Sequence, residues 1–590
     1  DSWNVSDLVG KLATIQVVDH AVGGWGHLNV DEIVQTDRKP PAWLTDATRQ
    51  FKISTRYLNL PIKNGATKRA VTLSADGQTL VRNDVELADG KADWWAPMDV
   101  SAWNGKTLTV KIDRLPEDSS ALDAIQPSDR IADDGDLYAE PLRGQLHFSA
   151  KRGWNNDPNG MVYFASEYHL FFQHNPYGCN WGNMHWGHAV SKDLVHWNEL
   201  SEALLPDRFG PMFSGSAVVD HANSSGFGTS GSGTAGQPPL VLIYTAAGDP
   251  TVQCLAYSSD GRAFTKFEQN PVIDQVTAGN RDPKVIWHEP SRRWVLALYV
   301  AVSGKHTIHI FNSPNLKDWK LASIVEGGIE GKDGYLCECP DFFELPVDGD
   351  RQNRKWVLSG ANSEYAIGTF DGSDFRPEIS KLTGQWGRGF YAPQTFSDVP
   401  QADGRRIQIG WFQTTTPGMP FNQSMTIPHE LGLAATTDGV RLTRQPAKEL
   451  ESLRRKTHRL EPFTLTPASA DLLTNLGTEL VEVRAEFEPS SEAEVVFTLG
   501  GATLSYVART QEIVVNGHRA PAPLKEGKIR LTVFVDRTGL EVFAADGLTY
   551  VPMPIDPTAK SLASSLKATG GTAKFSALTV YELRSIWQND

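Results

Sequence analysis

Three acidic residues stand out in the 590-residue sequence because each is followed, at once or one residue later, by proline. They are Asp157, Asp282 and Glu338. Proline cannot donate to a strand ladder and marks the start or edge of a strand. We therefore expect the three acids at the ends of strands, outside the sheets. Clustered carboxylates have two common uses, which are metal binding and glycoside hydrolysis.

The residues around these acids favour sugar chemistry over metal binding. In glycoside hydrolysis one carboxylic acid protonates the leaving oxygen, and a second carboxylate attacks or activates water. Crowding raises the pKa of one carboxyl, so that it stays protonated while its partner is ionised. A calcium site would favour carbonyl-rich loops with further acids. The neighbouring residues are instead Trp, Asn, Gln and His, which suit sugar hydroxyls and ring stacking.

An internal repeat predicts the scaffold that brings the acids together. The pattern is Ser or Thr, any residue, Asp or Asn, any three residues, then an aromatic residue or Leu. Each copy follows a strand-like run and suits a turn between the outer strands of a blade. The five copies start 67, 55, 56 and 67 residues apart and occupy Ser191–Trp197, Ser258–Phe264, Ser313–Trp319, Thr369–Phe375 and Thr436–Leu442. They predict a five-bladed β-propeller over residues 147–445.

The acids occupy matched positions in this repeat. Asp157, Asp282 and Glu338 precede the first, third and fourth copies by 34, 31 and 31 residues. The inner strands of a propeller line a central channel. Three acids at matched positions of three blades therefore face one locus.

The whole chain reads as all-β, because short alternating apolar runs are separated by Asp-Gly, Asn-Gly and Pro turn signals. Residues 1–114 form an N-terminal β-rich accessory region, and residues 1–40 look like the end of a truncated jelly roll. Residues 115–146, rich in Asp and Pro, are expected to be a linker. After the propeller we expect a charged linker helix over 446–460 and a C-terminal β-sandwich over 461–590.

Composition excludes several classes of partner. The net charge of −14 comes without a block of basic residues, so a nucleic-acid footprint and an anionic-membrane site are not expected. No apolar run approaches the roughly 20 residues of a membrane span. The four cysteines are too few for a disulfide scaffold and poorly spaced for zinc. We expect neither a metal nor a cofactor, and the sequence leaves oligomeric state and disulfide status open.

Several motifs together resemble one enzyme family. WNNDPNG (Trp154–Gly160), FSGSA (Phe213–Ala217), RDP (Arg281–Pro283) and ECPD (Glu338–Asp341) are similar to the signatures of glycoside hydrolase family 32. That family contains invertases, inulinases, levanases and fructan exohydrolases. The ordered match spans the repeat region and continues to a family-like VYELRSIW near the C-terminus. The family fold, a five-bladed propeller followed by a β-sandwich, agrees with the repeat.

The resemblance implies a role for each acid. Asp157 would be the nucleophile, Glu338 the general acid/base and Asp282 the stabiliser of the transition state. The resemblance also implies a set of residues that line the fructose subsite: Asn156, Gln173, Trp181, Phe213, Ser214 and Arg281. Two departures concern the subsite: Asn155 replaces the Met usual in the first motif, and the Cys-Glu-Cys run varies the residue before the acid. Substrate preference is therefore less well determined than the chemistry.

The implied function is a secreted, retaining β-fructosidase that removes terminal β-D-fructofuranosyl units from fructan. Its nucleophile and acid/base would lie roughly 5–5.5 Å apart. Levan is favoured over inulin and sucrose because of the extra N-terminal β-domain, which a sucrose invertase would not need and which resembles accessory domains ahead of some bacterial levanases and other fructanases. Trp94, Trp95 and Trp103 there would give a polymer extra contacts. The alternative is that this domain is a structural brace packed on the propeller. The alternatives are a transfructosylating or levanbiose-releasing member of the family and a non-catalytic fructan-binding relative.

Overall fold

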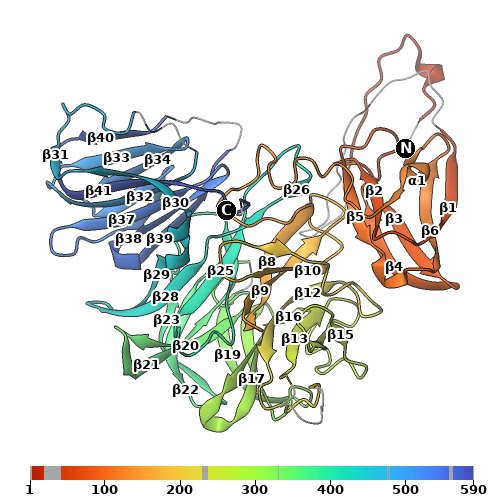
Figure 1. Cartoon of the computed structure of the whole chain (residues 1–590), viewed down its shortest axis with the longest axis horizontal. Helices are drawn as coiled ribbons and strands as arrows, with labels where there is room; N and C mark the ends of the chain where they lie inside the picture. Colours follow the sequence, from red (N-terminus) through yellow and green to blue (C-terminus); the bar gives the residue numbers. More distant parts are fainter. Residues whose placement is uncertain are drawn as a thin grey trace.

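The computed structural model describes residues 3–18, 33, 41–228, 237–329, 331–474, 476, 479–556 and 563–588. Strands take up 53% of the chain and helices 4%, which confirms the all-β prediction. Figure 1 shows three regions, with the N-terminal sheets in orange, the C-terminal sheets in blue and the largest region between and below them. In the described residues no helix is both long and apolar enough to cross a membrane.

The N-terminal region folds as two small sheets around one apolar core. The first has the order β1 (Trp43–Lys52), β6 (Thr107–Pro116), β3 (Arg69–Ala75) and β4 (Gln78–Val85), and the second has the order β5 (Trp94–Asp99), β2 (Tyr57–Ile62) and β7 (Gln126–Ser128). Short helices η2 (Ser101–Trp103) and α1 (Ala121–Ala124) connect them, and η1 (Ser6–Leu8) lies upstream. Strand β7 comes from the segment expected to be a linker and pairs with β2.

The tryptophans of this region are not all available to a ligand. Trp94 is 4% exposed in the core of the two sheets, and its indole Nε1 donates to Asn64 Oδ1 at 2.8 Å. Trp103 is half-buried and packs against the same core. The predicted role of Trp94 in polymer contact is therefore wrong, because its alternating position in β5 points inward. The predicted jelly roll over residues 1–40 falls mostly outside the described residues.

The central region consists of antiparallel runs whose first strands form a ring. β8 (Gly153–Phe164), β12 (Met212–Val219), β16 (Asn280–His288), β20 (Asp341–Val347) and β24 (Phe390–Thr395) each contact the next, and β24 returns to β8. Each run continues outward from its first strand, as expected of propeller blades. The outer strands complete three sheets: β9 (Glu167–Asn175), β10 (His185–Ser191) and β11 (Asn198–Glu199); β13 (Leu240–Ala246), β14 (Val252–Ser258) and β15 (Thr265–Lys266); β17 (Arg293–Val302), β18 (Lys305–Ser313) and β19 (Lys320–Ile329).

The last two runs are joined in one nine-stranded sheet. It contains β20 with β21 (Asp350–Ser359), β22 (Tyr365–Phe370) and β23 (Phe375–Leu382), and β24 with β25 (Arg406–Phe412), β27 (Ser424–Met425), β28 (His429–Thr436) and β29 (Gly439–Pro446). The junction is a single parallel pair between Val347 and Leu433. Strand β26 (Phe421–Asn422) crosses from this last run to pair with β8, which ties the end of the ring to its beginning. Helix η3 (Glu289–Ser291) links β16 to β17.

The repeated motif forms the turn between the third and fourth strands of each run. In the first copy Ser191 ends β10, and Asp193 accepts backbone hydrogen bonds from Val195 and His196. The third copy repeats the arrangement with Asn315, which accepts from the backbone of the residues two and three positions later. The aromatic ring at the motif's end bonds back into the turn, since Trp197 Nε1 donates to Leu194 O at 3.1 Å. The motif therefore marks blade edges, as its period predicts.

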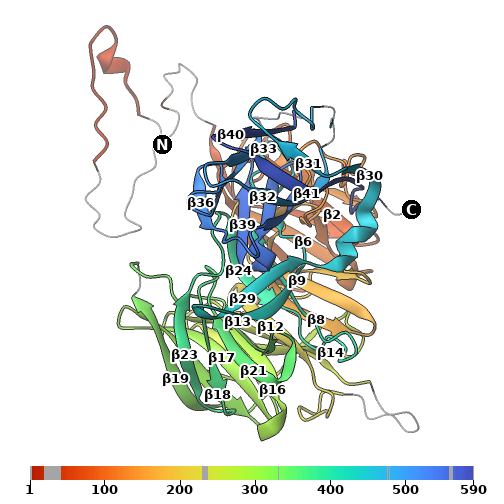
Figure 2. The same ribbon diagram turned by 90° about the vertical axis from the view of Figure 1, so that its left-hand side faces the viewer.

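A two-sheet C-terminal unit follows. One sheet contains β30 (Arg454–Leu460), β41 (Ala573–Leu583), β32 (Val481–Pro489), β37 (Ile529–Val535), β38 (Gly539–Ala544), β39 (Thr549–Pro554) and β31 (Phe463–Leu465). The other contains β36 (His518–Pro521), β35 (Glu512–Val515), β34 (Ala502–Val507), β33 (Glu494–Leu499) and β40 (Ser565–Thr569), and η5 (Ala545–Gly547) follows β38. Figure 2 shows this unit stacked above the propeller.

The segment between propeller and sandwich differs from the prediction. Residues 446–460 were expected to form a helix, but only Lys448–Leu453 adopts a short 3-10 helix, η4, and Arg454–Leu460 is strand β30. Strand β30 pairs with β41 along most of its length, so the cross-strand bonds outweigh the helical spacing of its charges. Tertiary pairing overrides weak local propensity in this way.

A buried polar cluster joins the propeller to the sandwich. The imidazole of His147 lies 2.7 Å from Asp536 Oδ2 through Nδ1 and 2.9 Å from Glu541 Oε1 through Nε2. Glu541 also accepts from Tyr550 OH at 2.6 Å and contacts His429 at 2.7 Å. All of these side chains are buried. Interactions of this kind hold the segment just before β8 against the C-terminal sheets.

Candidate active site

The three predicted acids surround one cysteine. Asp157 comes from β8, Asp282 from β16, and Glu338 lies three residues before β20 begins. The backbone N–H of Cys339 donates to Asp282 Oδ2 at 3.0 Å. The Cys339 thiol Sγ lies 3.5 Å from Asp282 Oδ2 and 3.5 Å from Asp157 Oδ2. Acids separated by more than 180 residues in the chain therefore meet at one place, where first strands of the ring come together.

Strand bulges aim the side chains at this place. Register shifts interrupt the pairing of four first strands, between Asn155 and Pro158, Met212 and Gly215, Arg281 and Lys284, and Tyr391 and Gln394. Asp157 and Asp282 thus lie inside strands, and the prediction that they sit outside the sheet is wrong. At a bulge the residue needs no ladder partner, so the following proline is tolerated there.

The backbone at the site is strained. Asp282, Glu338 and Cys339 adopt positive φ angles of 64°, 51° and 36°, a left-handed conformation that costs non-glycine residues about 1–3 kcal/mol each. The Asp282 N–H donates to Thr245 Oγ1 at 3.0 Å, and the Cys339 N–H bond to Asp282 holds the other segment. The surrounding contacts therefore maintain an arrangement that these residues would not adopt alone.

Asp157 is held by two neutral donors. Ser214 Oγ donates to Oδ2 at 2.7 Å, and Asn156 Nδ2 donates to Oδ1 at 3.1 Å. Asn156 is oriented in turn by Trp154 Nε1, which donates to its Oδ1 at 3.0 Å. Burial raises the pKa of Asp157, and the bonds from Ser214 and Asn156 oppose that rise in part. The carboxyl has a defined orientation and little access to bulk water.

Glu338 has a charged and a neutral partner. Arg281 Nη2 contacts Oε1 at 2.5 Å, and Tyr391 OH donates to Oε2 at 2.6 Å. Burial alone would raise the pKa of Glu338, but the Arg281 charge and the two hydrogen bonds outweigh burial and hold the pKa below its usual value. Arg281 also lies over the Tyr299 ring at 4.6 Å. These contacts therefore favour the ionised form of Glu338.

Asp282 titrates at a higher pH than an ordinary aspartate. Burial and the charges of Glu338 and Asp157 together raise the pKa of Asp282 to about 7, against the opposing charge of Arg281. Asp282 is buried and the other two carboxyls are partly buried, and interacting carboxyls of this kind titrate as a group. The cluster can therefore hold one ionised and one protonated carboxyl near neutral pH. Cleavage of a glycosidic bond needs the proton on the acid and an ionised nucleophile.

The remaining predicted residues, Trp181, Phe213 and Gln173, lie on or against the start of β12, the strand that carries Ser214. Trp181 is 53% exposed, which excludes a core role, and its ring meets Phe213 edge-on at 5.9 Å between centroids. Phe213 is half-buried in β12 beside Ser214. Gln173 is 2% exposed, and its amide Nε2 donates to Met212 O at 2.9 Å. Gln173 therefore stabilises the bulge of β12, whereas Trp181 and Phe213 form an aromatic wall.

Sequence analysis missed two residues on the Glu338 side. Tyr391 bonds Glu338 directly, and Trp411 contacts the rings of both Tyr391 and Trp154 at 6.1 and 5.9 Å. Counting back from the fifth repeat copy does not reach Tyr391. The excursion that carries β26 and β27 lies between β25 and β28 and lengthens this run. The final spacing of 67 residues equals the first one, so the repeat gave no signal for Tyr391.

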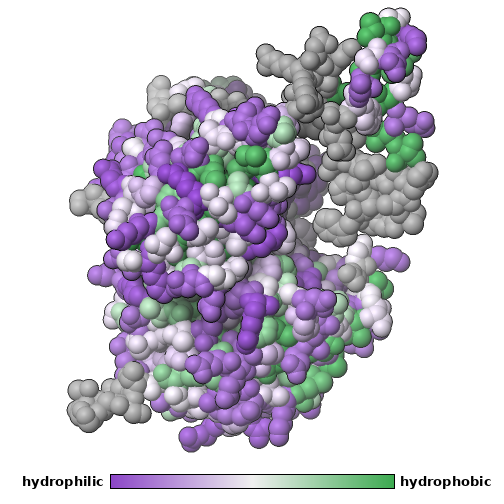
Figure 3. Space-filling model, turned by 90° about the vertical axis from the view of Figure 1, so that its right-hand side faces the viewer, coloured by the Kyte–Doolittle hydropathy of each residue, from purple (hydrophilic) through white to green (hydrophobic). Residues whose placement is uncertain are grey.

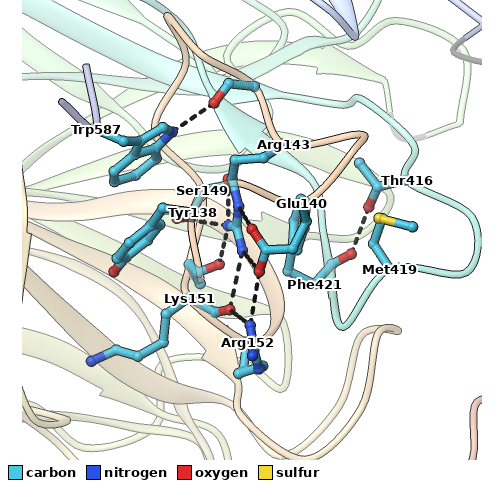
Figure 4. Close-up of polar contacts among 12 residues, drawn as sticks. Tyr138, Glu140, Arg143, Ser149, Lys151, Arg152, Thr416, Met419, Phe421 and Trp587 are labelled. Carbon is cyan, nitrogen blue, oxygen red and sulfur yellow. Dashed lines mark hydrogen bonds and ion pairs between the residues drawn. The ribbon is translucent and has the colours of Figure 1, made fainter. Parts of the chain in front are cut away.

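A buried ion cluster anchors the segment that enters β8. Arg143 is wholly buried and donates two hydrogen bonds of 2.9 Å to the Glu140 carboxylate (Figure 4). It also donates one of 2.9 Å to Ser149 Oγ. Arg152 Nη1 contacts the same carboxylate at 2.8 Å. The Arg143 guanidinium also lies 3.3 Å from the centre of the Phe421 ring in β26. The chain is thus tied down immediately before Trp154 and Asp157.

Comparison with known proteins identifies the family. Residues 147–446 match the model of the glycosyl hydrolases family 32 N-terminal domain, and residues 449–582 match that of the family 32 C-terminal region. A levanase from Bacillus subtilis is 40% identical over 500 residues, covering 77% of this chain and 72% of the relative. An extracellular exo-inulinase from Aspergillus niger is 33% identical over 529 residues, covering 76% and 96%.

Solved structures agree. The crystal structure of exo-inulinase from Aspergillus awamori matches with a TM-score of 0.67 at 30% identity, covering 76% of this chain and 100% of that chain. A β-fructofuranosidase from Schwanniomyces occidentalis in complex with fructosyl-erythritol gives 0.68 at 28% identity, covering 75% and 98%. With both family models matched in order and a carboxyl cluster at the convergence of the first strands, this chain belongs to glycosyl hydrolase family 32 and is a glycoside hydrolase.

Proposed function

We propose that this enzyme is a retaining β-fructosidase that hydrolyses terminal β-D-fructofuranosyl units of fructan. The observation that carries the proposal is the grouping of Asp157, Asp282 and Glu338 around Cys339, with Arg281 on Glu338. The family membership and the levanase and inulinase relatives supply the substrate class. The chemistry needs only carboxyl groups and water.

Asp157 is assigned as the nucleophile. Its Oδ2 and Oδ1 are held by Ser214 and Asn156, which keeps one oxygen directed at the anomeric carbon of a bound fructosyl unit. Attack forms a covalent glycosyl ester between the carboxylate oxygen and that carbon while the bond to the leaving oxygen breaks. Glu338 gives its proton to the leaving oxygen, and Asp282 holds fructose hydroxyls and stabilises the charged transition state.

Water completes the reaction. Glu338, now ionised, removes a proton from water as the water attacks the anomeric carbon and displaces Asp157. Two displacements return the original configuration. The Arg281 and Tyr391 contacts favour the ionised form of Glu338, which suits this second step. For the first step Glu338 must carry a proton and Asp157 must be ionised; the buried Asp282, whose pKa is raised to about 7, is a neighbouring group able to hold that proton.

Levan is the favoured substrate, ahead of inulin and sucrose. Support comes from the Bacillus subtilis levanase, which has higher identity to this chain than the exo-inulinase relatives do.

The same relatives support secretion, since the Aspergillus enzymes are named extracellular. The surface view shows hydrophilic and hydrophobic residues interspersed (Figure 3). The proposed partner is a neutral fructan chain, without nucleic acid or membrane.

The test is fructose release from levan, inulin and sucrose measured side by side, with the anomer formed first identified by NMR. Asp157→Asn and Glu338→Gln should each lower kcat on the order of 10³-fold or more. Azide should partly restore the Glu338→Gln variant, because it attacks without needing a base. The matched control is Asp274→Asn, which removes an exposed carboxyl and should behave as wild type. Normal turnover by either site variant, or inversion at the anomeric carbon, would overturn the assignment.

A further inference from the structure

The loop that carries Trp181 is anchored in the N-terminal domain. This loop, residues 176–184, connects β9 to β10 of the first blade. Tyr177 lies four residues before Trp181 and is 5% exposed within the apolar core of the N-terminal sheets. Cys179 packs against the same core. A propeller side chain thus completes a hydrophobic core that otherwise belongs to another domain.

A second anchor lies on the other side of Trp181. The amide of Asn183 makes two reciprocal bonds with the backbone of β4: Asp84 N–H donates to its Oδ1 at 2.8 Å, and its Nδ2 donates to Asp84 O at 2.7 Å. Asn183 Nδ2 also reaches Asn175 Oδ1 at 3.1 Å, at the end of β9. Asn183 has a φ of 45°, a conformation that asparagine tolerates better than most residues. One side chain therefore joins the loop, its own blade and the N-terminal sheet.

The space behind the loop makes these anchors necessary. A cavity of about 310 Å³ lies between the N-terminal sheets and the first blade, and Pro176, Tyr177 and Trp103 are among its walls. His185, just after the loop, also lines it, and its buried Nε2 has no partner among the described residues. Close packing alone therefore does not hold the loop from behind. Bonds from Asn175 Nδ2 to Asn180 O at 2.8 Å and from Asn422 Nδ2 to Cys179 O at 3.1 Å hold the middle of the loop on the propeller. Tyr177 and Asn183 fix its two ends to the N-terminal sheets.

The anchored loop contacts the residue next to the one that holds the predicted nucleophile. The exposed Trp181 ring rests edge-on against Phe213, and the next residue, Ser214, holds the Asp157 carboxylate at 2.7 Å. A displacement of the loop would move Trp181 away from the wall that Phe213 begins. Misplacement of a binding group by about 1 Å can cost roughly a hundredfold in rate.

We propose that the N-terminal β-domain is a structural part of the fructose subsite: it sets the position of Trp181 through Tyr177 and Asn183, with Asn183 as the positioning residue. The inference rests on the proposed function, because it takes Trp181 as a ring that contacts fructose. It assigns the domain a role on every substrate that fills the subsite, whether polymer or sucrose. A domain that served only as a polymer-binding module would leave sucrose hydrolysis untouched.

The test is a double-mutant cycle in the full chain. Asn183→Gly removes both bonds to Asp84 and keeps a residue that accepts positive φ. It should raise KM for sucrose and for levan alike, by about tenfold, with a smaller change in kcat. Trp181→Ala should raise KM further, and the double variant should match Trp181→Ala alone, because Asn183 acts through that ring. Asn183→Asp places a carboxylate oxygen against the acceptors Asp84 O and Asn175 Oδ1 and should raise KM at least as much as Asn183→Gly.

The matched control is Asn516→Gly in the C-terminal sandwich. Asn516 also has a positive φ, 46°, and its Oδ1 accepts from the Thr503 N–H at 2.9 Å. It should lose similar stability without a change in KM. Additive effects of Asn183→Gly and Trp181→Ala, an unchanged KM in Asn183→Gly, or a loss on levan alone would each overturn the inference. Wild-type protein that releases no fructose would refute the proposed function itself, and the inference with it.

Discussion

Removing the buried negative charge of Glu140 should lower the stability of the protein strongly, although Glu140 touches no substrate. Its carboxylate is 6% exposed and neutralises Arg143, which is 0% exposed, and Arg152, which is 5% exposed. Glu140→Gln keeps the size of the side chain but leaves two guanidinium groups buried without a counter-charge. Breaking a buried pair from one side costs about 3–5 kcal/mol. We expect a loss of that size in the free energy of the propeller's unfolding transition.

Urea unfolding followed by circular dichroism would measure this loss, and an exposed pair provides the control. Glu344 contacts Arg354 at 2.5 Å, but their side chains are 34% and 37% exposed. Glu344→Gln should therefore cost no more than about 1 kcal/mol. Below the unfolding transition both variants should retain wild-type kcat. Equal destabilisation by the two substitutions would refute the argument that burial of Glu140 sets the cost.

Three further outcomes are expected. Burial lowers the pKa of His147, but Asp536 and Glu541 outweigh burial and raise it to about 9; the resulting stabilisation, roughly 3 kcal/mol, is complete below about pH 6.5 and lost as pH rises through 9. Thermal melts from pH 6 to 10 should show this decline, and His147→Gln should flatten it. Trp181→Ala should impair substrate use while the melting temperature barely moves, whereas a core ring would cost about 3–5 kcal/mol. Burial raises the pKa of the Cys339 thiol well above its usual value. Iodoacetamide at pH 8 should therefore neither alkylate Cys339 in the folded protein nor reduce activity. Mass spectrometry would show whether Cys339 is labelled.

The three acids could be predicted from sequence because the propeller repeats. Each turn motif sits at the same blade edge, so a constant distance back along the chain reaches the start of a first strand. Asp157, Asp282 and Glu338 were identified in this way, and the structure places all of them around Cys339. Tyr391 could not be identified, because the last run contains an excursion that breaks the spacing. Periodicity predicts positions only where the period is uninterrupted.

The contacts between domains could not be predicted from the sequence either, for a different reason. Nothing in the composition of residues 176–184 says that Tyr177 enters the core of a domain about 80 residues upstream. Trp94 shows the converse, since an aromatic pair in a strand does not reveal which ring faces inward until the pairing of β5 is known. The choice between core and ligand contact for an aromatic residue depends on register, and register comes from tertiary pairing.

Trp94 also changes the argument for levan. With that ring in the core and Trp103 half-buried against it, two of the three tryptophans give little support to a polymer-binding surface. Trp95 lies on the other face of β5 and is half-buried. The preference for levan now rests on the family relatives. The domain's contacts with the Trp181 loop suggest instead that it shapes the pocket that every fructosyl substrate must enter. Arg281 and Tyr391 hold Glu338, the acid that must protonate the leaving oxygen. Selection between β-2,6 and β-2,1 linkages would then arise beside these two residues, where the leaving group lies.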